Sequence, residues 1–211
     1  GIFCSESNPT ISGCTITDNT ATYYGGGIYF ESSSSPTISD CTISGNEADV
    51  GGGIFCYQSE STISGCTITG NTTDYFGGGI GSDSSNPTIS DCTISGNEAD
   101  VGGGIFYYQS ESTVSGCTIT GNTATTYGGG IYCYGNSNPT ISDSVICGNA
   151  PNQMFGSYTA SGSCIAESCD VCTSDSDDDG VPDGQDQCPG EDDTIDTDSD
   201  GTPDCIDDFP N

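Results

Sequence analysis

Residues 41–55 read CTISGNEADVGGGIF, and the same fifteen letters recur at residues 92–106. The Gly-Gly-Gly-Ile element within this stretch occurs five times, at steps of 26, 26, 25 and 26 residues, beginning at Gly25, Gly51, Gly77, Gly102 and Gly128. A period held this closely is typical of a solenoid, in which each repeat forms one coil stacked on the next. Positions one period apart then become neighbours at about 4.8 Å.

Three columns of β-branched residues run down the repeats. They comprise Ile2, Ile28, Ile54, Ile80, Ile105 and Ile131; Ile11, Ile38, Ile63, Ile89, Val114 and Ile141; and Ile16, Ile43, Ile68, Ile94, Ile119 and Ile146. Such residues favour strands, and the Ser, Gly, Asn and Asp between them favour turns. We therefore predict an all-β fold in which residues 1–150 form a parallel β-helix of about six coils of 25–27 residues, with three short strands per coil.

Two further columns lie in the predicted turns. One holds Asn19, Asn46, Asn71, Asn97, Asn122 and Asn149, and the other holds Cys14, Cys41, Cys66, Cys92 and Cys117. An Asn in a turn tolerates a left-handed backbone, and its amide can bond the same amide one coil away. Each Cys lies two residues before a core Ile, so we expect these five thiols to face the core, reduced and inert.

This pattern resembles the right-handed parallel β-helix of bacterial surface proteins, in which asparagine ladders line one turn. The Gly-Gly-Gly-Ile and Thr-Ile-Ser-Gly-Asn segments are also similar to the repeats of polymorphic outer-membrane proteins. The resemblance covers about residues 1–150 and implies a right-handed β-helix at a bacterial outer surface. It says little about activity, because β-helices include lyases, hydrolases, adhesins and inert stalks.

The composition removes most catalytic chemistry. The chain has 31 acidic residues, no Lys, Arg or His, and a net charge of −31. No Ser-His-Asp or Cys-His arrangement, Schiff-base lysine or imidazole metal ligand can therefore form. We predict that the protein is not an enzyme, with a carboxylate-only hydrolase as the open alternative. Nucleic acid and direct membrane insertion are excluded as interactions, because phosphate backbones are bound by Lys and Arg and no apolar transmembrane stretch is present.

Two outward columns allow more than one interpretation. The residue before each Cys alternates between Gly and Asp (Gly13, Asp40, Gly65, Asp91, Gly116, Asp143). This alternation keeps like charges about 10 Å apart, or else forms a ladder of cation sites. An aromatic stripe follows the inward Ile at Phe3, Tyr29, Phe55, Phe106 and Tyr132, broken at Gly81. Such rings stabilise strands by packing together, or they bind sugars by their faces.

The fourteen cysteines favour an oxidising, extracellular setting. Cys4, Cys56 and Cys133 share a column with Phe30, Ser82 and Tyr107, and they lie too many coils apart to pair with one another. Six others fall where the repeats end, and we predict that these form disulfides of open connectivity: Cys147, Cys164, Cys169, Cys172, Cys188 and Cys205.

The repeat is expected to stop after Asn149. Residues 151–172 are predicted to form a C-terminal cap and disulfide-rich linker, in which no core column continues. Residues 173–211 carry fifteen acids at strict spacing, as two twelve-residue loops that offer alternate oxygens, a Gly at position 6 and a main-chain carbonyl at position 7. The predicted Ca²⁺ ligands are Asp175, Asp177, Asp179, Val181, Asp183 and Asp186 in the first loop, and Asp196, Asp198, Asp200, Thr202, Asp204 and Asp207 in the second.

These loops lack flanking helices and resemble thrombospondin type-3 repeats, in which Asp-rich loops wrap calcium and cysteines staple the chain. The match runs from Ser174 to Asp208, with Cys188 and Cys205 at the spacer positions, although Phe209-Pro210 stands where a further cysteine would be expected. The resemblance implies a calcium-stiffened connector of an adhesive extracellular protein.

The sequence as a whole predicts a non-enzymatic secreted or cell-surface structural or adhesin-like protein, a rigid rod with a calcium-stabilised connector. Its partners would be calcium and extracellular glycans or other surface proteins. One alternative is a carbohydrate-binding or carbohydrate-active β-helix. The other is a self-stacking extracellular filament subunit that associates end to end through an uncapped first coil, since the opening residues are expected to belong to a longer chain.

Overall fold

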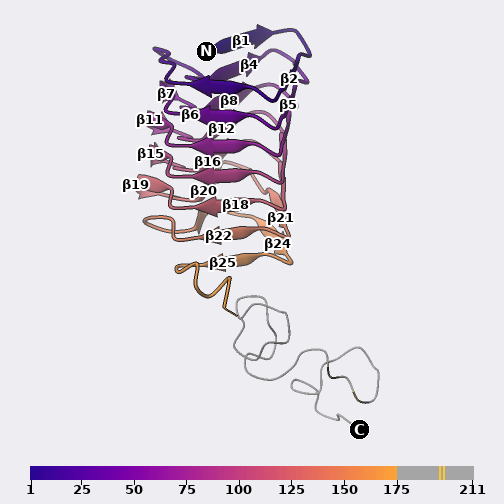
Figure 1. Ribbon diagram of the computed structural model, residues 1–211, viewed down its shortest axis with the longest axis vertical. Coiled ribbons are helices and arrows are strands. Elements are labelled where there is room, and N and C mark those ends of the chain that lie inside the picture. The colour runs from indigo at the N-terminus through magenta and orange to yellow at the C-terminus, as the bar shows by residue number, and fades with distance from the viewer. Residues whose placement is uncertain (175–194, 196, 198–211) are drawn as a thin grey trace.

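The computed structural model describes residues 1–174, 195 and 197. Every regular element in this part is a β-strand, and strands of neighbouring repeats pair in parallel, so the coils stack into a β-helix (Figure 1). The predicted all-β parallel β-helix with three strands per coil is confirmed. Among these residues there is no helix long and apolar enough to cross a membrane.

Three sheets of seven strands run the length of the stack. Sheet 1 contains β1 Ile2–Ser5, β4 Ile28–Glu31, β8 Ile54–Tyr57, β12 Ile80–Asp83, β16 Ile105–Tyr108, β20 Ile131–Tyr134 and β23 Met154–Phe155. Sheet 2 contains β2 Thr10–Ser12, β5 Thr37–Ser39, β9 Thr62–Ser64, β13 Thr88–Ser90, β17 Thr113–Ser115, β21 Thr140–Ser142 and β24 Thr159–Ser161. Sheet 3 contains β3 Thr15–Thr17, β6 Thr42–Ser44, β10 Thr67–Thr69, β14 Thr93–Ser95, β18 Thr118–Thr120, β22 Val145–Cys147 and β25 Cys164–Ala166.

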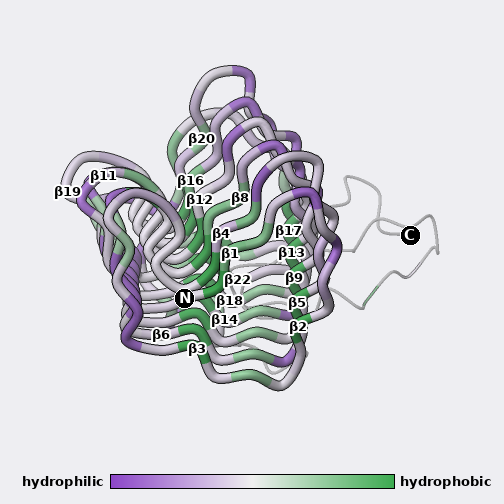
Figure 2. Tube along the Cα trace, turned by 90° about the horizontal axis from the view of Figure 1, so that it is seen from above, coloured by the Kyte–Doolittle hydropathy of each residue, from purple (hydrophilic) through white to green (hydrophobic). Residues whose placement is uncertain are grey.

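The three β-branched columns form the core, as predicted. Each Ile pairs with the Ile one turn away, and the columns are buried throughout the middle of the stack. Figure 2, which looks down the stack, shows these hydrophobic positions superposed from turn to turn. A fourth inward column in sheet 1 mixes sizes: Phe30 lies between Cys4 and Cys56, and Tyr107 lies between Ser82 and Cys133. Small neighbours leave room for each large ring, so the core stays filled.

A fourth, shorter sheet was not predicted. Sheet 4 contains β7 Glu47–Val50, β11 Thr72–Phe76, β15 Glu98–Val101 and β19 Thr123–Tyr127. Its inward positions are occupied by small residues, namely Ala48, Thr73, Ala99 and Ala124. Because this column lacks large β-branched side chains, the sequence carried little strand signal there.

The asparagine column forms the predicted ladder at the corner after sheet 3. Each amide Nδ2 donates to the Oδ1 of the next Asn at 2.9–3.0 Å and, from Asn46 onward, also to a main-chain carbonyl one turn back. Gln153 ends the ladder: its Oε1 accepts from the main-chain N and the Nδ2 of Asn149, both at 2.9 Å. The left-handed backbone belongs to the residue before each Asn rather than to the Asn itself, for example Gly70 with φ 61°.

The stack also continues beyond Asn149. Met154 pairs with Ile131, Ala160 with Ile141, and Ile165 with Ile146. The expectation that no core column continues here was wrong. The last turn belongs to the stack, but it is shorter than the others. Its pairs lie 23, 19 and 19 residues apart (131 to 154, 141 to 160 and 146 to 165), so a search at the repeat period misses it.

Candidate functional site

The predicted calcium ligands cannot be placed. All twelve lie at residues 175–207, outside the described residues. The two loops, their calcium and the resemblance to thrombospondin type-3 repeats therefore stay predictions.

The aromatic stripe is the candidate site on the described surface. Phe3, Tyr29, Phe55, Phe106 and Tyr132 each follow an inward Ile on sheet 1 and point out of the core, as predicted, and Phe155 extends the column. The rings at the C-terminal end of the column lie nearly parallel, with Phe106 and Tyr132 inclined by 5° and Tyr132 and Phe155 by 3°. Those at the other end are more inclined, Phe3 and Tyr29 by 32° and Tyr29 and Phe55 by 28°. This column is the floor of a groove.

The floor is less accessible than an outward stripe would suggest. Phe55 and Phe106 are only 4% and 7% exposed. Two rings at the end of sheet 4 cover them. Phe76, the last residue of β11, stacks on Phe106 with centroids 4.8 Å apart, and Tyr24, which pairs with the last residue of β7, stacks on Phe55 at 5.2 Å. The rings accessible to a ligand are therefore mainly those of the groove's sides.

One side of the groove is formed by the residue that precedes each Gly triplet, here called the rim column. Its members alternate between a ring and Val: Tyr24, Val50, Phe76, Val101 and Tyr127. The three rings are 49%, 38% and 46% exposed. Sequence reasoning missed this column, although the alternation was readable, because the corner that places it beside sheet 1 belongs to the unpredicted sheet 4.

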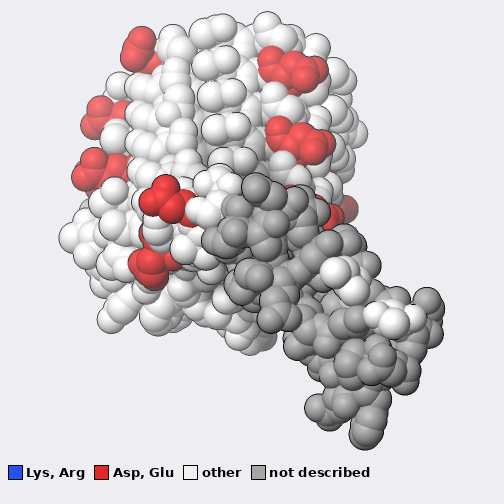
Figure 3. Space-filling view, turned by 60° about the horizontal axis from the view of Figure 1, so that its bottom comes forward, with Lys and Arg blue, Asp and Glu red and all other residues white. Residues whose placement is uncertain are grey.

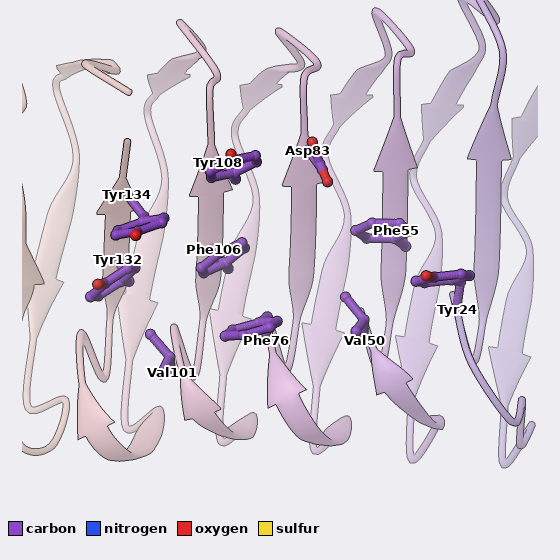
Figure 4. A pocket seen from close by; sticks show the side chains of 10 residues that line it. All are labelled: Tyr24, Val50, Phe55, Phe76, Asp83, Val101, Phe106, Tyr108, Tyr132 and Tyr134. Carbon is purple, nitrogen blue, oxygen red and sulfur yellow. The ribbon is translucent and has the colours of Figure 1, made fainter. Parts of the chain in front are cut away.

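The other side is formed by the last residues of the sheet 1 strands, which include Asp83, Tyr108 and Tyr134. The rings of Tyr108 and Tyr134 lie 5.7 Å apart, inclined by 21°. Between the two sides runs an open groove of about 540 Å³, lined by Tyr24, Val50, Phe55, Phe76, Asp83, Val101, Phe106, Tyr108, Tyr132 and Tyr134. Figure 4 shows these side chains spread along successive strands, with Phe55 and Phe106 on either side of the strand that carries Asp83.

Gly81 interrupts the floor for a steric reason. It pairs with Phe55 on one side and Phe106 on the other. A Cβ at Gly81 would lie 2.9 Å from Cδ2 of Phe55, which means that the Phe55 ring already leans over this position. The break in the stripe is therefore part of the packing of the floor.

Asp83 is the one charged residue among the ten that line the groove, and its Oδ1 accepts a hydrogen bond of 2.8 Å from Ser84 Oγ. Close by on the floor, the Tyr29 hydroxyl donates to Glu31 Oε2 at 2.8 Å, and burial together with this carboxylate raises the pKa of Tyr29. Since the chain has no Lys, Arg or His, no basic side chain neutralises these acids. Figure 3 shows another face of the molecule, where the acids form separate patches with uncharged residues between them.

The alternating Asp and Gly before the cysteines occupy a left-handed turn. Asp40 has φ 54°, Gly65 59° and Asp91 53°, a conformation open to Gly and tolerated by Asp. Each Asp leans toward the next turn, since a Cβ at Gly65 would lie 2.8 Å from Asp40 Oδ1. The alternative of a cation ladder finds no support, because within residues 1–174 no three His, Cys, Asp or Glu side chains form a group that could hold a metal.

Within the described residues the regular cysteines form no disulfide and are free thiols, as predicted. Cys41, Cys66, Cys92 and Cys117 are buried, and each donates to the carbonyl two residues before it at 3.1–3.3 Å. Cys14 is exposed because it lies in the first turn of the stack, so the expectation that all five face the core holds for four.

Cys4, Cys56 and Cys133 do not pair with one another, as predicted, and they have no disulfide partner in the part of the chain that the structure describes. Burial raises the pKa of Cys56 to about 11 and that of Cys133 to about 12. These two thiols therefore stay protonated and unreactive at neutral pH.

Four of the six irregular cysteines form disulfides. Cys147 bonds to Cys169 and Cys164 bonds to Cys172, which fastens residues 167–172 to the last turns of the stack. Cys188 and Cys205 lie outside the described residues.

Comparison with known proteins identifies the family of the repeat region. Residues 1–152 match the family described as periplasmic copper-binding protein (NosD), and the chain belongs to that family. No curated protein and no solved structure matches the chain.

Proposed function

We propose that this protein is a non-enzymatic structural protein of the bacterial periplasm or cell surface, with a rigid β-helix that presents its outer columns to adhesive partners. The observation that carries this proposal is the unbroken ladder from Asn19 to Gln153, which links every turn to the next through side chains as well as strands. A stack joined in this way resists bending and local opening. Membership of a family described as periplasmic supports the location.

The absence of basic side chains supports a non-enzymatic role, because the groove offers rings, hydroxyls and a single carboxylate, Asp83. We expect no lyase or hydrolase turnover on neutral or acidic polysaccharides. A reproducible activity that a single Asp or Glu substitution within residues 1–150 abolishes would overturn this expectation and favour the carboxylate-only hydrolase.

Copper does not enter the proposal. Proteins hold copper through Cys, Met and His, but this chain has no His and one Met. The buried thiols lie one per turn in a column rather than around a common point, and each donates a hydrogen bond to the main-chain carbonyl two residues before it. The described residues therefore do not fit a copper site, and we derive no role for this metal.

The C-terminal connector is proposed to be stabilised by calcium. Fifteen carboxylates within residues 173–211 repel one another, and that segment has too few large apolar residues for a core of its own. Two Ca²⁺ ions would neutralise four charges and take the place of the missing core. Extracellular modules of this type bind calcium at about 10⁻⁴–10⁻³ M, which suits a calcium-rich medium.

The test uses the whole chain with its disulfides intact. Calorimetric titration with Ca²⁺ should detect two sites, and the hydrodynamic radius should fall as they fill. Asp175→Ala and Asp196→Ala should each remove one site, whereas Asp170→Ala, an exposed acid before the loops, should remove none. Finding no calcium-dependent change at about 10 mM, far above the range for such modules, would leave the tail as an acidic linker.

A further inference from the structure

We propose that the groove between the rim column and sheet 1 binds a linear, uncharged glycan laid along the axis of the stack. This inference goes beyond the structural role proposed above and does not depend on the calcium connector. It rests on the spacing of the exposed rings, the length of the groove and its charge.

The exposed rings recur at every second turn. Tyr24 and Phe76 lie on the rim of the groove, and Tyr127 continues the same column beside Phe155, 4.6 Å away. A Val lies between successive rings, since Val50 is the strand-pairing partner of both Tyr24 and Phe76. At about 4.8 Å per turn, successive rings lie roughly 9.6 Å apart, which is close to the length of two pyranose units in an extended β-linked chain.

The groove combines apolar rings with a few polar groups. The rings of Tyr24 and Phe76 can pack against the C–H face of a sugar, while the hydroxyls of Tyr108 and Tyr134 and the carboxylate of Asp83 can bond its hydroxyl groups. Tyr supplies both kinds of contact from one side chain. A site of rings with a few placed polar groups is the usual composition of a small-ligand pocket, and here it is drawn out along the stack.

Shape favours a polymer over a compact ligand. The lining residues run from Tyr24 in the turn of β4 to Tyr134 on β20, which spans four strand spacings, or roughly 19 Å. The groove is open along this length. We expect affinity to rise with the number of sugar units until the chain covers the groove, at about four units by the spacing above.

Charge selects among glycans. Asp83 faces the groove and Glu31 lies beside its floor, with no basic residue in the chain to offset them. Uronate, sulfate and phosphate groups would be repelled, because like charges in a partly desolvated groove interact strongly. Cellulose-like and N-acetylated chitin-like chains carry no charge and meet no such penalty.

The experiment measures binding of cello-oligosaccharides and N-acetylated chito-oligosaccharides of two to six units to the whole chain by calorimetry. Oligogalacturonate serves as the anionic probe. We expect at least one neutral series to bind with affinity that grows with length, and oligogalacturonate not to bind. Failure of every neutral oligosaccharide and of their insoluble polymers to bind would overturn the proposal.

Matched variants locate the site. Phe76→Ala and Tyr24→Ala should weaken binding about tenfold each, the loss expected for one ring contact. The controls are Tyr75→Ala and Tyr23→Ala, which remove exposed rings one residue earlier that do not line the groove, and they should change affinity less than twofold. Equal losses in both pairs would place binding elsewhere and overturn the proposal. Thermal unfolding checks that each variant is folded.

Asp83→Asn tests the charge argument. It should leave neutral glycans bound and raise the affinity of oligogalacturonate relative to the unaltered chain. Binding of a neutral oligosaccharide that Asp83→Asn abolishes but Phe76→Ala leaves unchanged would show that the rings do not hold the ligand and would overturn the proposal. Calcium titration of the same variants should be unchanged, so a failure here is distinguishable from a failure of the calcium connector.

Discussion

The asparagine corner and the aromatic groove are both built from columns that repeat once per turn, yet they vary in different ways. The corner repeats Asn in six successive turns; all but Asn19 are buried, and hydrogen bonds between the side-chain amides join them. The rim column alternates ring and Val, and its rings are exposed. Where stacking alone satisfies a buried polar group, every turn must present the same side chain. Where a column faces solvent, its identity is free to follow a two-turn period.

The largest expected effect lies in the corner. Asn71→Ala removes two donated bonds, to Ile43 O and to Asn97 Oδ1, and the oxygen that accepts from the main-chain N and the Nδ2 of Asn46. Several buried groups are left unpaired at a cost of 1–3 kcal/mol each, so we expect a loss of about 4 kcal/mol in the free energy of unfolding. Urea unfolding measures it. Asn19→Ala, in the less buried first turn, is the control and should cost less than half as much, and equal losses would contradict the role of burial.

Two glycines in one segment allow a direct comparison of the asparagine corner and the aromatic groove. A Cβ at Gly79 would lie 2.6 Å from Gly104 O and 3.1 Å from Asn97 Nδ2. A Cβ at Gly81 would be too close only to the Phe55 ring, at 2.9 Å, and would meet main chain at an ordinary contact distance, 3.5 Å from Gly51 Cα. Backbone cannot move aside but a ring can rotate, so we expect Gly79→Ala to cost about 3 kcal/mol and Gly81→Ala about 1 kcal/mol or less. Thermal and urea unfolding of the two variants would decide. A Gly81→Ala variant as unstable as Gly79→Ala would show that the groove floor is packed as rigidly as the corner.

The alternation of Asp and Gly allows a test of charge. Gly65→Asp would place carboxylates in three successive turns, while Gly65→Asn makes the same steric contact with Asp40 without the charge. We expect the Asp variant to be about 1 kcal/mol less stable than the Asn variant at pH 7. Carboxylates crowded together have folded-state pKa values above the unfolded value. The difference should therefore vanish as the pH falls below about 4, where all are protonated. Equal stability of the two variants at pH 7 and low salt would show that backbone conformation alone explains the alternation.

The smallest effect is expected within the core of sheet 1. Tyr107 is fully buried, and its hydroxyl and that of Ser112 have no hydrogen-bond partner among the described residues. Tyr107→Phe removes a hydroxyl that is buried without a hydrogen bond. The free energy of unfolding should therefore change by less than about 1 kcal/mol or increase slightly. Ser112→Ala, which removes the other unpaired hydroxyl, is the companion variant. A large loss in the Tyr107 variant would show that the hydroxyl is satisfied in solution, for example by a buried water.

The predicted parts of the fold were those in which one residue type recurs at the coil spacing. The Ile columns, the asparagine ladder and the free thiols of the middle turns could all be read from spacing, because stacking brings equivalent positions together. Sheet 4 could not, since Ala48, Ala99 and Ala124 carry no strand preference. The last turn was missed because its shortened spacing departs from the repeat.

The candidate groove likewise has one part that the sequence predicted and one part that it did not. Its floor was predicted from the alternation of inward Ile and outward ring on each strand, which needs only the two-residue period of a strand. Its rim was not, because Tyr24 and Phe76 lie outside sheet 1 and approach the floor only through the corner that follows sheet 4. Phe55 and Phe106 are buried because these rings cover them, and the strand pattern alone does not show this.

The stacking of the chain in coils, the residues that become neighbours from one turn to the next, and the catalytic chemistries that are absent could all be inferred without a structure. Those conclusions follow from a period and a composition, and both are properties of the chain alone. The three-dimensional fold was needed to show that the aromatic stripe is the floor of a groove, that Asp83 is the charge within it, and that Cys147 and Cys164 bond to Cys169 and Cys172 respectively. These depend on how each corner folds within one turn, where several local packings compete and the repeat imposes no choice.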